Sequence, residues 1–266
     1  MIPKKIHYCW FGKNPKPPLV EFCIASWKKY LPDYEIIEWN EENFDVSQNN
    51  FVKEAYAKQK WAFVSDFARA KVMYEWGGFY LDTDMELRNT LNDFIEYRAV
   101  CGFEIKGIPY SAFWGVEKEH ILAKKMVEFY EQSTYQETPN TQIFSELLVK
   151  EFGADANKDE FQELKHGVKL FPSNYFSLDL PRNYVVHHFS GSWHGSWTEE
   201  KNTYKEMVNM YGILNTILQE ERSKEKIKNV VFNHQVLSID PILDQIPTRY
   251  IFNYIVRKIK SKLFKP

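Results

Sequence analysis

An α/β fold with a mostly parallel central sheet flanked by helices is predicted by three features of this 266-residue sequence. Strand-like and helix-like segments alternate from the start of the chain. One helical segment then stops at two glycines, and a short apolar strand follows it directly. With 44% hydrophobic and 17% aromatic residues, the chain can also bury one large core. We expect one α/β domain over residues 1–230 and a helical C-terminal segment over residues 231–266.

The first 60 residues begin with β-α-β order, and the helix around Asp66 and the strand before Asp82 complete a nucleotide-binding half-domain of the doubly wound kind. Alternating apolar residues predict a strand over residues 4–8, and a second strand is expected over residues 34–39. Between them, apolar side chains recur every three or four residues over residues 19–30, which predicts a helix. A further helix is expected over residues 51–60. Trp10 follows the first strand, at the sheet edge where open α/β folds bind ligands.

The next helix carries an acidic and a basic residue on one face and ends at glycine. Ser65 can cap its start, and Gly77 or Gly78 supplies the left-handed residue that ends it. Asp66 and Arg69 lie three residues apart, so they share a face of the helix. A local salt bridge is the simpler interpretation. We favour a sugar-binding pair, because a carboxylate and a guanidinium offer matched acceptors and donors to hydroxyl groups.

Two aspartates follow the short strand expected over residues 79–81. By strand alternation Asp82 and Asp84 face one side, and Thr83 points away. Two carboxylates without a neighbouring lysine or arginine repel each other, and a divalent cation is the usual compensation. A turn or a surface pair is the alternative, but the position directly after an apolar strand favours a metal site.

The later half of the chain is predicted to be mixed α/β. Its expected strands cover residues 99–103, 111–116, 168–171 and 184–188, and its expected helices cover residues 120–132, 142–152 and 199–228. His187 and His188 stand ahead of a Gly-Ser-Trp loop, and an imidazole beside two carboxylates suits a transition metal such as manganese. Trp193, like Trp10, follows a strand and can stack on a planar base, although core packing is the alternative.

Composition and charge exclude several classes of protein. The net charge of −2 argues against a nucleic-acid-binding body, and three cysteines without C-x-x-C spacing argue against a disulfide framework or a thiolate zinc site. We expect a cytoplasmic protein without a signal peptide. From residue 249 onward the chain is basic and amphipathic, which favours peripheral attachment to the inner face of a membrane. A packed C-terminal helix with a solvated basic end is the simpler alternative, and a partner-binding helix is another.

These motifs resemble those of glycosyltransferase family 32, which includes bacterial capsule and polysaccharide transferases and relatives in clostridial glucosylating toxins. The resemblance covers most of the chain and rests on four segments of this sequence. They are the opening Ile2-Pro3-Lys4-Lys5-Ile6-His7-Tyr8-Cys9-Trp10-Phe11-Gly12, the Ser65-Asp66-x-x-Arg69 motif, the run from Tyr74 to Asp84, and His188-Phe189-Ser190-Gly191-Ser192-Trp193.

The resemblance implies a single GT-A type domain that binds a nucleotide sugar. It implies a metal-dependent hexosyltransferase that retains the anomeric configuration and transfers a hexose, from UDP by family habit, to a saccharide of capsule or cell-surface polysaccharide biosynthesis. A lipid-linked acceptor is expected if the basic C-terminal segment lies on the membrane. A catalytically silent scaffold or binding protein is the alternative.

The resemblance also assigns residues. The catalytic set would be Asp66, Arg69, Asp82 and Asp84. The donor site would add Trp10, Ser65, Tyr80 and Trp193, with Trp10 on the base and Tyr80 on the ribose. Mn²⁺ or Mg²⁺ would bind Asp82, Asp84 and His188, and His187 is a rival for the histidine. Asn140 and Gln142 are candidates for the acceptor side.

Overall fold

The computed structural model describes residues 1–179 and 183–190, together with residues 248, 252, 255 and 256. The chain divides into two compact units, Met1–Ile213 and Leu214–Pro266. The predicted helix over residues 199–228 and the domain boundary after residue 230 lie outside the described residues and stay predictions, as does nearly all of the predicted basic segment. None of the helices in the described part of the chain is long and apolar enough to cross a membrane.

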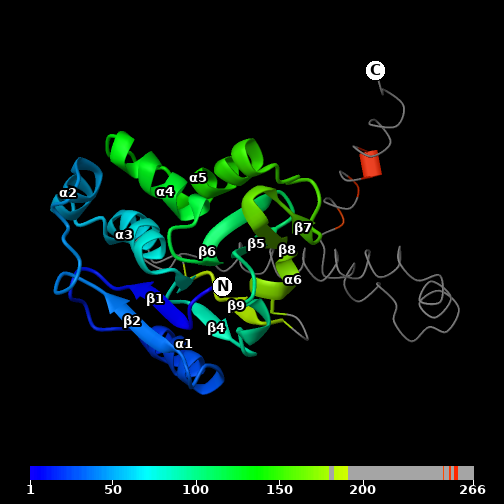
Figure 1. The fold of residues 1–266 in the computed structure, drawn as a ribbon, viewed down its shortest axis with the longest axis horizontal. Helices are drawn as coiled ribbons and strands as arrows, with labels where there is room; N and C mark the ends of the chain where they lie inside the picture. The colour runs from blue at the N-terminus through cyan, green and yellow to red at the C-terminus, as the bar shows by residue number, and fades with distance from the viewer. Residues whose placement is uncertain (180–182, 191–247, 249–251, 253–254, 257–266) are drawn as a thin grey trace, which may run out of the picture. The chain divides into compact units, whose positions relative to one another are not determined.

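Seven strands form the central sheet, and five of them run in the same direction (Figure 1). Their order across the sheet is β2-β1-β3-β6-β5-β8-β7. Only β6 and β7 run opposite to the other strands of this sheet, so the predicted mostly parallel sheet is confirmed. The strands are β1 (Lys5–Cys9), β2 (Glu35–Trp39), β3 (Gly78–Leu81), β5 (Ala99–Ile105), β6 (Ile108–Val116), β7 (Gln162–Glu163) and β8 (Val168–Phe171).

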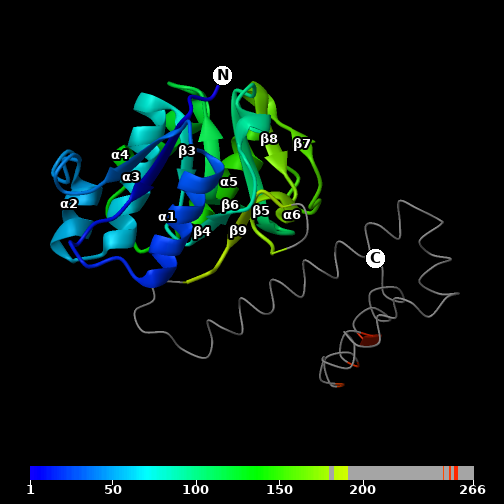
Figure 2. The same cartoon turned by 90° about the horizontal axis from the view of Figure 1, so that it is seen from below.

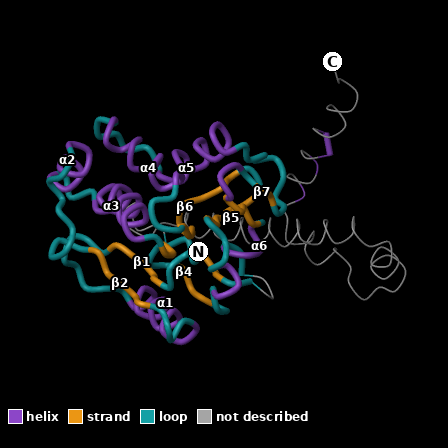
Figure 3. Tube along the Cα trace, viewed as in Figure 1, coloured by secondary structure: helices purple, strands orange, loops and turns teal. Residues whose placement is uncertain are grey.

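Helices lie on both sides of this sheet (Figures 2 and 3). A hydrophobic core packs against each of its two faces. The first core packs one face against α2 (Asn50–Ala57), α3 (Trp61–Trp76), α4 (Ile121–Gln132) and α5 (Asn140–Leu147), which a π-helical turn, Leu148–Phe152, extends. The second core packs the other face against α1 (Pro18–Tyr30), α6 (Ser173–Phe176), the 3-10 turn Asn92–Phe94 and a separate two-stranded sheet of β4 (Met85–Leu87) and β9 (Val185–His187). A second 3-10 turn, Lys165–Gly167, precedes β8.

The glycine stop of α3 is confirmed, but the predicted cap at its start is wrong. The helix begins at Trp61, so Ser65 lies inside it, and its hydroxyl donates to the Trp61 carbonyl at 3.0 Å. Gly77 ends the helix with φ of 62°, and its N–H donates to the Met73 carbonyl. A Cβ at Gly77 would lie 2.6 Å from the Lys118 nitrogen, so glycine is needed both for the left-handed conformation and for the close approach.

The segment from Asp82 to Asp84 is a turn and does not continue the strand. The Met85 N–H donates to the Asp82 carbonyl at 3.0 Å, which closes the turn, and the chain then enters β4 in a different sheet. Strand alternation therefore does not set the directions of the two carboxylates, as the sequence had suggested, although the charge of Asp84 still acts on Asp82. Instead, the turn directs Asp82 toward α3 and Asp84 toward the segment after β9.

Candidate active site

A buried arginine joins the two acidic groups that the sequence singled out. Arg69 on α3 contacts the Asp66 carboxylate through Nη2 at 3.0 Å and the Asp82 carboxylate through Nη1 at 3.0 Å. Nη1 also donates to the Ser111 carbonyl at 3.3 Å, and the guanidinium lies 4.6 Å from the centroid of the Tyr80 ring. The i, i+3 spacing predicted the first contact. The contact between Arg69 and Asp82 depends on β3 ending beside α3.

Burial sets the charge state of this cluster. Burial raises the pKa of Asp66 to about 7, because it outweighs the opposing charge of Arg69, and the charge of Asp82 adds to the rise. Burial also raises the pKa of Asp82, although Arg69 opposes the shift. For Arg69 itself, burial is outweighed by the two aspartates, so its pKa stays well above the ordinary value. The Arg69 Nε atom is buried and has no partner among the described residues.

Asp84 is held by the segment that follows β9. One carboxylate oxygen, Oδ2, accepts hydrogen bonds from both the backbone N–H and the hydroxyl of Ser190, each at 2.8 Å. The other oxygen, Oδ1, lies 3.5 Å from Nε2 of His187. Burial works against ionisation of Asp84, but the His187 charge and these hydrogen bonds outweigh it and hold its pKa below the ordinary range. Asp84 is therefore an anion that the protein already contacts on both oxygens.

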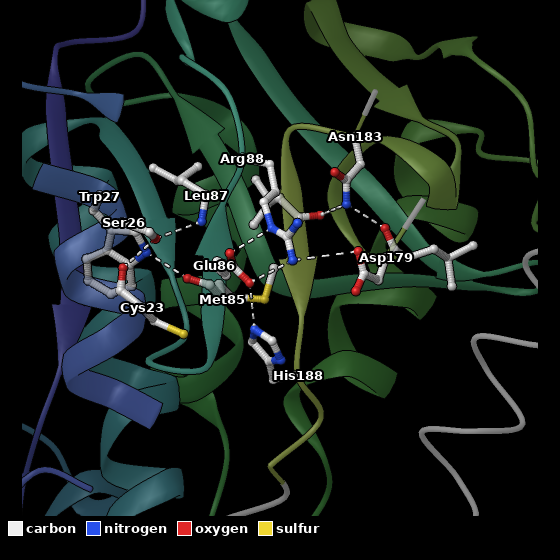
Figure 4. Close-up of polar contacts among 12 residues, drawn as sticks. Cys23, Ser26, Trp27, Met85, Glu86, Leu87, Arg88, Asp179, Asn183 and His188 are labelled. Carbon is white, nitrogen blue, oxygen red and sulfur yellow. Dashed lines mark hydrogen bonds and ion pairs between the residues drawn. The ribbon is translucent and has the colours of Figure 1, made fainter. Parts of the chain in front are cut away.

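His188 points to a different carboxylate, as Figure 4 shows. Its Nε2 donates to Glu86 at 3.0 Å, and the same carboxylate accepts from Nε and Nη2 of Arg88 at 2.7 and 3.1 Å. Arg88 also lies 3.7 Å from Asp179. The structure therefore brings His187 to the Asp-x-Asp motif and places His188 on Glu86.

Side chains of α1 hold the other edge of β4 (Figure 4). Trp27 donates its indole N–H to the Met85 carbonyl at 2.6 Å, and the Leu87 N–H donates to the Ser26 hydroxyl at 2.9 Å. These bonds satisfy backbone groups that an edge strand would otherwise leave unpaired in a buried position. The short strand after the Asp-x-Asp turn is therefore fixed on one edge by β9 and on the other by α1.

Trp10 lies in the loop after β1. Its indole N–H donates to the Asn14 carbonyl at 2.7 Å, and the Lys16 ammonium lies 5.8 Å from the ring centroid. Lys16 also pairs with Glu38 at 2.8 Å. Trp193, the second predicted stacking residue, lies outside the described residues.

The two acceptor-side candidates lie in different surroundings. Asn140 is buried, and its amide donates to the Tyr130 hydroxyl at 2.6 Å, while its Oδ1 has no partner among the described residues. Burial and the charge of Asp66 raise the pKa of Tyr130, which places this pair on the Asp66 side of the site. Gln142 is exposed and donates to Glu146 at 3.1 Å, away from that pair.

Metal ligands can be sought only among the described residues. No group of three His, Cys, Asp or Glu side chains converges there closely enough to hold a metal ion. Asp82, 30% exposed at its side chain, and Asp84 supply oxygen donors of the kind that Mg²⁺ and Mn²⁺ bind, and His187 supplies an adjoining imidazole.

Sequence reasoning missed Glu86, Arg88 and Ser190. The first two continue an alternating pattern of charged residues, Asp82-x-Asp84-x-Glu86-x-Arg88, which could have indicated a functional edge beyond the two aspartates. Ser190 belongs to the motif segment that begins at His188, but no role was assigned to it, because its contact with Asp84 joins residues 106 positions apart.

The class of protein follows from these features and from a family model. A buried Asp-Arg-Asp cluster lies beside an Asp-x-Asp turn at the carboxyl end of β3, in an α/β fold. Residues 17–100, which contain this cluster, match the model described as a glycosyltransferase sugar-binding region containing a DXD motif. The chain therefore contains a glycosyltransferase domain, and Asp82-Thr83-Asp84 is the Asp-x-Asp triplet in the matched region.

Several solved structures are similar to this chain at low sequence identity. The PaToxG glycosyltransferase is 17% identical, with a TM-score of 0.45, and the match covers 56% of this chain and 69% of that one. A glycosyltransferase involved in glycosylation of the PBCV-1 major capsid is 10% identical, with a TM-score of 0.43 and coverage of 76% and 98%. The galactosyltransferase LgtC, solved with donor and acceptor sugar analogues, is 13% identical, with a TM-score of 0.37 and coverage of 77% and 83%. These likenesses are too distant to carry a functional argument. No curated protein is similar enough in sequence to count as a relative.

Proposed function

We propose that this glycosyltransferase transfers a hexose from a nucleotide sugar, UDP-linked in our reading, to a saccharide acceptor, with divalent metal as cofactor and retention at the anomeric carbon. The observation that carries the proposal is the Arg69 guanidinium held between Asp66 and Asp82. It supports the proposal because a carboxylate and a guanidinium, which together can bind hydroxyl groups, lie next to the first aspartate of the Asp-x-Asp triplet. Family 32 membership, UDP and retention come from the sequence resemblance.

The donor would lie along the carboxyl ends of β1 and β3. In this proposal Trp10 stacks on the base, Tyr80 lies near the ribose, and Asp66 with Arg69 binds the sugar hydroxyls. Asp66 is suited to this role because its buried carboxyl has a pKa of about 7, so it can accept or donate a hydrogen bond near neutral pH. Ser65 is a weaker candidate, because its hydroxyl already donates within α3. Trp193 stays a prediction.

The metal would be held by Asp82 and Asp84, with His187 as the imidazole in preference to His188. The preference rests on the 3.5 Å approach of His187 to Asp84 and on the engagement of His188 by Glu86. When bound, Mn²⁺ or Mg²⁺ would offset the negative charge on the diphosphate oxygens. Arg69 also contacts Asp82, so its guanidinium would lie beside the same diphosphate oxygens as the metal.

The reaction breaks the bond between the anomeric carbon and the diphosphate oxygen and forms a bond from that carbon to an acceptor hydroxyl oxygen, which gives up its proton. Arg69 and the Asp82 turn are fixed before the donor arrives, so they need little rearrangement to stabilise charge on the leaving group. A lipid-linked capsular or cell-surface saccharide is the proposed acceptor, on the assumption that the basic C-terminal segment lies on the inner membrane surface.

The proposal is tested by nucleotide binding. We would titrate UDP, GDP, CDP and TDP calorimetrically with and without Mn²⁺ into wild type and into Asp84→Asn. Asp33→Asn is the matched control, because Asp33 lies in an exposed ion pair with Lys4. We expect Mn²⁺-dependent binding of UDP that Asp84→Asn abolishes and Asp33→Asn retains. Binding of none of the four nucleotides would favour the alternative, a catalytically silent scaffold.

A further inference from the structure

We infer that Glu86 is a positioning residue for the metal site. Through His188 it fixes the segment 187–190, which contacts Asp84, and so sets the affinity for the divalent cation. This inference rests on the proposed function, because it assumes that Asp84 and His187 bind a metal. Glu86 and Arg88 are outside the residues that the family resemblance assigns, and His188, which the resemblance assigns as a metal ligand, contacts Glu86 instead.

Both oxygens of the Glu86 carboxylate are used. Oε1 accepts from Arg88 Nε at 2.7 Å, and Oε2 accepts from Arg88 Nη2 at 3.1 Å and from His188 Nε2 at 3.0 Å (Figure 4). Glu86 is only 7% exposed. A two-point contact from a guanidinium fixes the plane of the carboxylate as well as its position. The direction from which His188 approaches is therefore also fixed.

The histidine contact lies at the end of a very short ladder. β4 and β9 pair over three residues, with Met85 opposite His187, and the His188 N–H then donates to the Asp84 carbonyl at 3.0 Å. Two residues further on, Ser190 binds the Asp84 carboxylate. Backbone hydrogen bonds over only three residue pairs would hold this segment weakly by themselves. Besides the contacts of Ser190 and His187 with Asp84, the Glu86–His188 bond ties this segment to β4 through a side chain that does not belong to the Asp-x-Asp triplet.

The same contact separates the roles of the two histidines. Because Glu86 is an acceptor, Nε2 of His188 must carry a hydrogen, so this nitrogen is not available to a metal. His187, held in place by its neighbour, directs Nε2 toward Asp84 at 3.5 Å. Partners of this kind, one step removed from a metal, commonly change its affinity 10–100-fold when they are mutated.

The charges of the network support a positioning role. Asp84 and Glu86 are two residues apart, and both act on the buried Cys23 thiol, whose pKa of about 12 is raised first by burial and then by these two charges. Two adjacent carboxylates repel each other unless each has its own partner. Arg88 neutralises Glu86, which leaves Asp84 as the acidic group toward which His187 and a cation are drawn.

The experiment compares Mn²⁺ affinities at saturating UDP, measured calorimetrically, together with urea unfolding without metal. Glu86→Gln breaks the two-point contact and should weaken Mn²⁺ binding about 10–100-fold. Glu146→Gln is the matched control, because Glu146 pairs with Lys150 on the surface, and it should bind Mn²⁺ as wild type does.

A pair of substitutions at His188 separates positioning from direct ligation. Glutamine can place an N–H near the position of Nε2, so His188→Gln should bind Mn²⁺ more tightly than His188→Ala does. Equal and complete loss in both variants would show that His188 itself is the ligand and would overturn the inference. So would Mn²⁺ binding within twofold of wild type in Glu86→Gln. In both cases UDP binding by wild type would still depend on Mn²⁺. If UDP binding by wild type did not depend on Mn²⁺, the proposed function would be overturned as well.

Discussion

Lowering the pH from about 7.5 to about 4 should remove ~3 kcal/mol of folding free energy that depends on one buried histidine, His7. His7 lies in β1 and is fully buried. Its Nδ1 accepts from the Trp39 indole N–H at 3.0 Å, so its hydrogen is on Nε2, which donates to the Gly77 carbonyl at 2.8 Å. A proton added at Nδ1 would face the N–H of Trp39.

The magnitude follows from the pKa. Burial lowers the pKa of His7 from 6.5 to about 4, although the Gly77 hydrogen bond opposes the shift. The two pKa values differ by about 2.5, and a difference of one in pKa corresponds to about 1.36 kcal/mol, which gives ~3 kcal/mol. Because the folded protein binds the proton less readily than the unfolded chain, this contribution is fully present above pH 6.5. It is lost as the pH falls from 6.5 to about 4.

The assay is urea unfolding at a series of pH values, followed by tryptophan fluorescence, for wild type and His7→Gln. Subtracting the two free energies removes the contribution of all other titrating groups. The difference should fall by ~3 kcal/mol across the window. In Trp39→Phe, which removes the indole N–H that faces Nδ1, the fall should be smaller. A difference between wild type and His7→Gln that does not change with pH would refute the reasoning.

Three further substitutions test the framework of the site, each by urea unfolding near neutral pH. Trp27→Phe leaves the buried Met85 carbonyl without its donor and should cost about 1–3 kcal/mol. Gly77→Ala forces a left-handed residue and a contact of 2.6 Å with the Lys118 nitrogen, and should cost at least about 1–3 kcal/mol. Arg69→Met leaves two carboxylates without their cation and should cost about 3–5 kcal/mol. A change below about 0.5 kcal/mol would contradict the structural reason given for that residue.

Local signals predicted the helices and strands well, and they failed where a long-range contact decides the structure. Hydrophobic spacing located α1 to within a residue at its start, and the glycine pair located the end of α3. The Asp82–Asp84 segment looked like the continuation of a strand. It became a turn because β4 pairs with β9, a strand about 100 residues later, and that pairing leaves no local trace in the sequence.

The same distinction applies to the site. The Asp66–Arg69 contact was predictable because helix geometry brings residues three apart together. The bond from Arg69 to Asp82 was not, since it requires α3 to pack beside the end of β3. Nor could the sequence decide between His187 and His188, because adjacent residues differ only in direction, and that direction is set by Glu86 on another strand.

The balance of charges gives a physical reason for a divalent cation at this site. Its carboxyl groups belong to Asp66, Asp82, Asp84, Glu86 and, 3.7 Å from Arg88, Asp179, and its arginines are Arg69 and Arg88. With every carboxyl ionised, three negative charges remain beyond the arginines. Part of that excess is relieved by the raised pKa of Asp66. A divalent cation would relieve most of the rest, and it would do so where Asp82 is already shared with Arg69. The guanidinium and the cation would then lie side by side, which is the arrangement that a departing diphosphate requires.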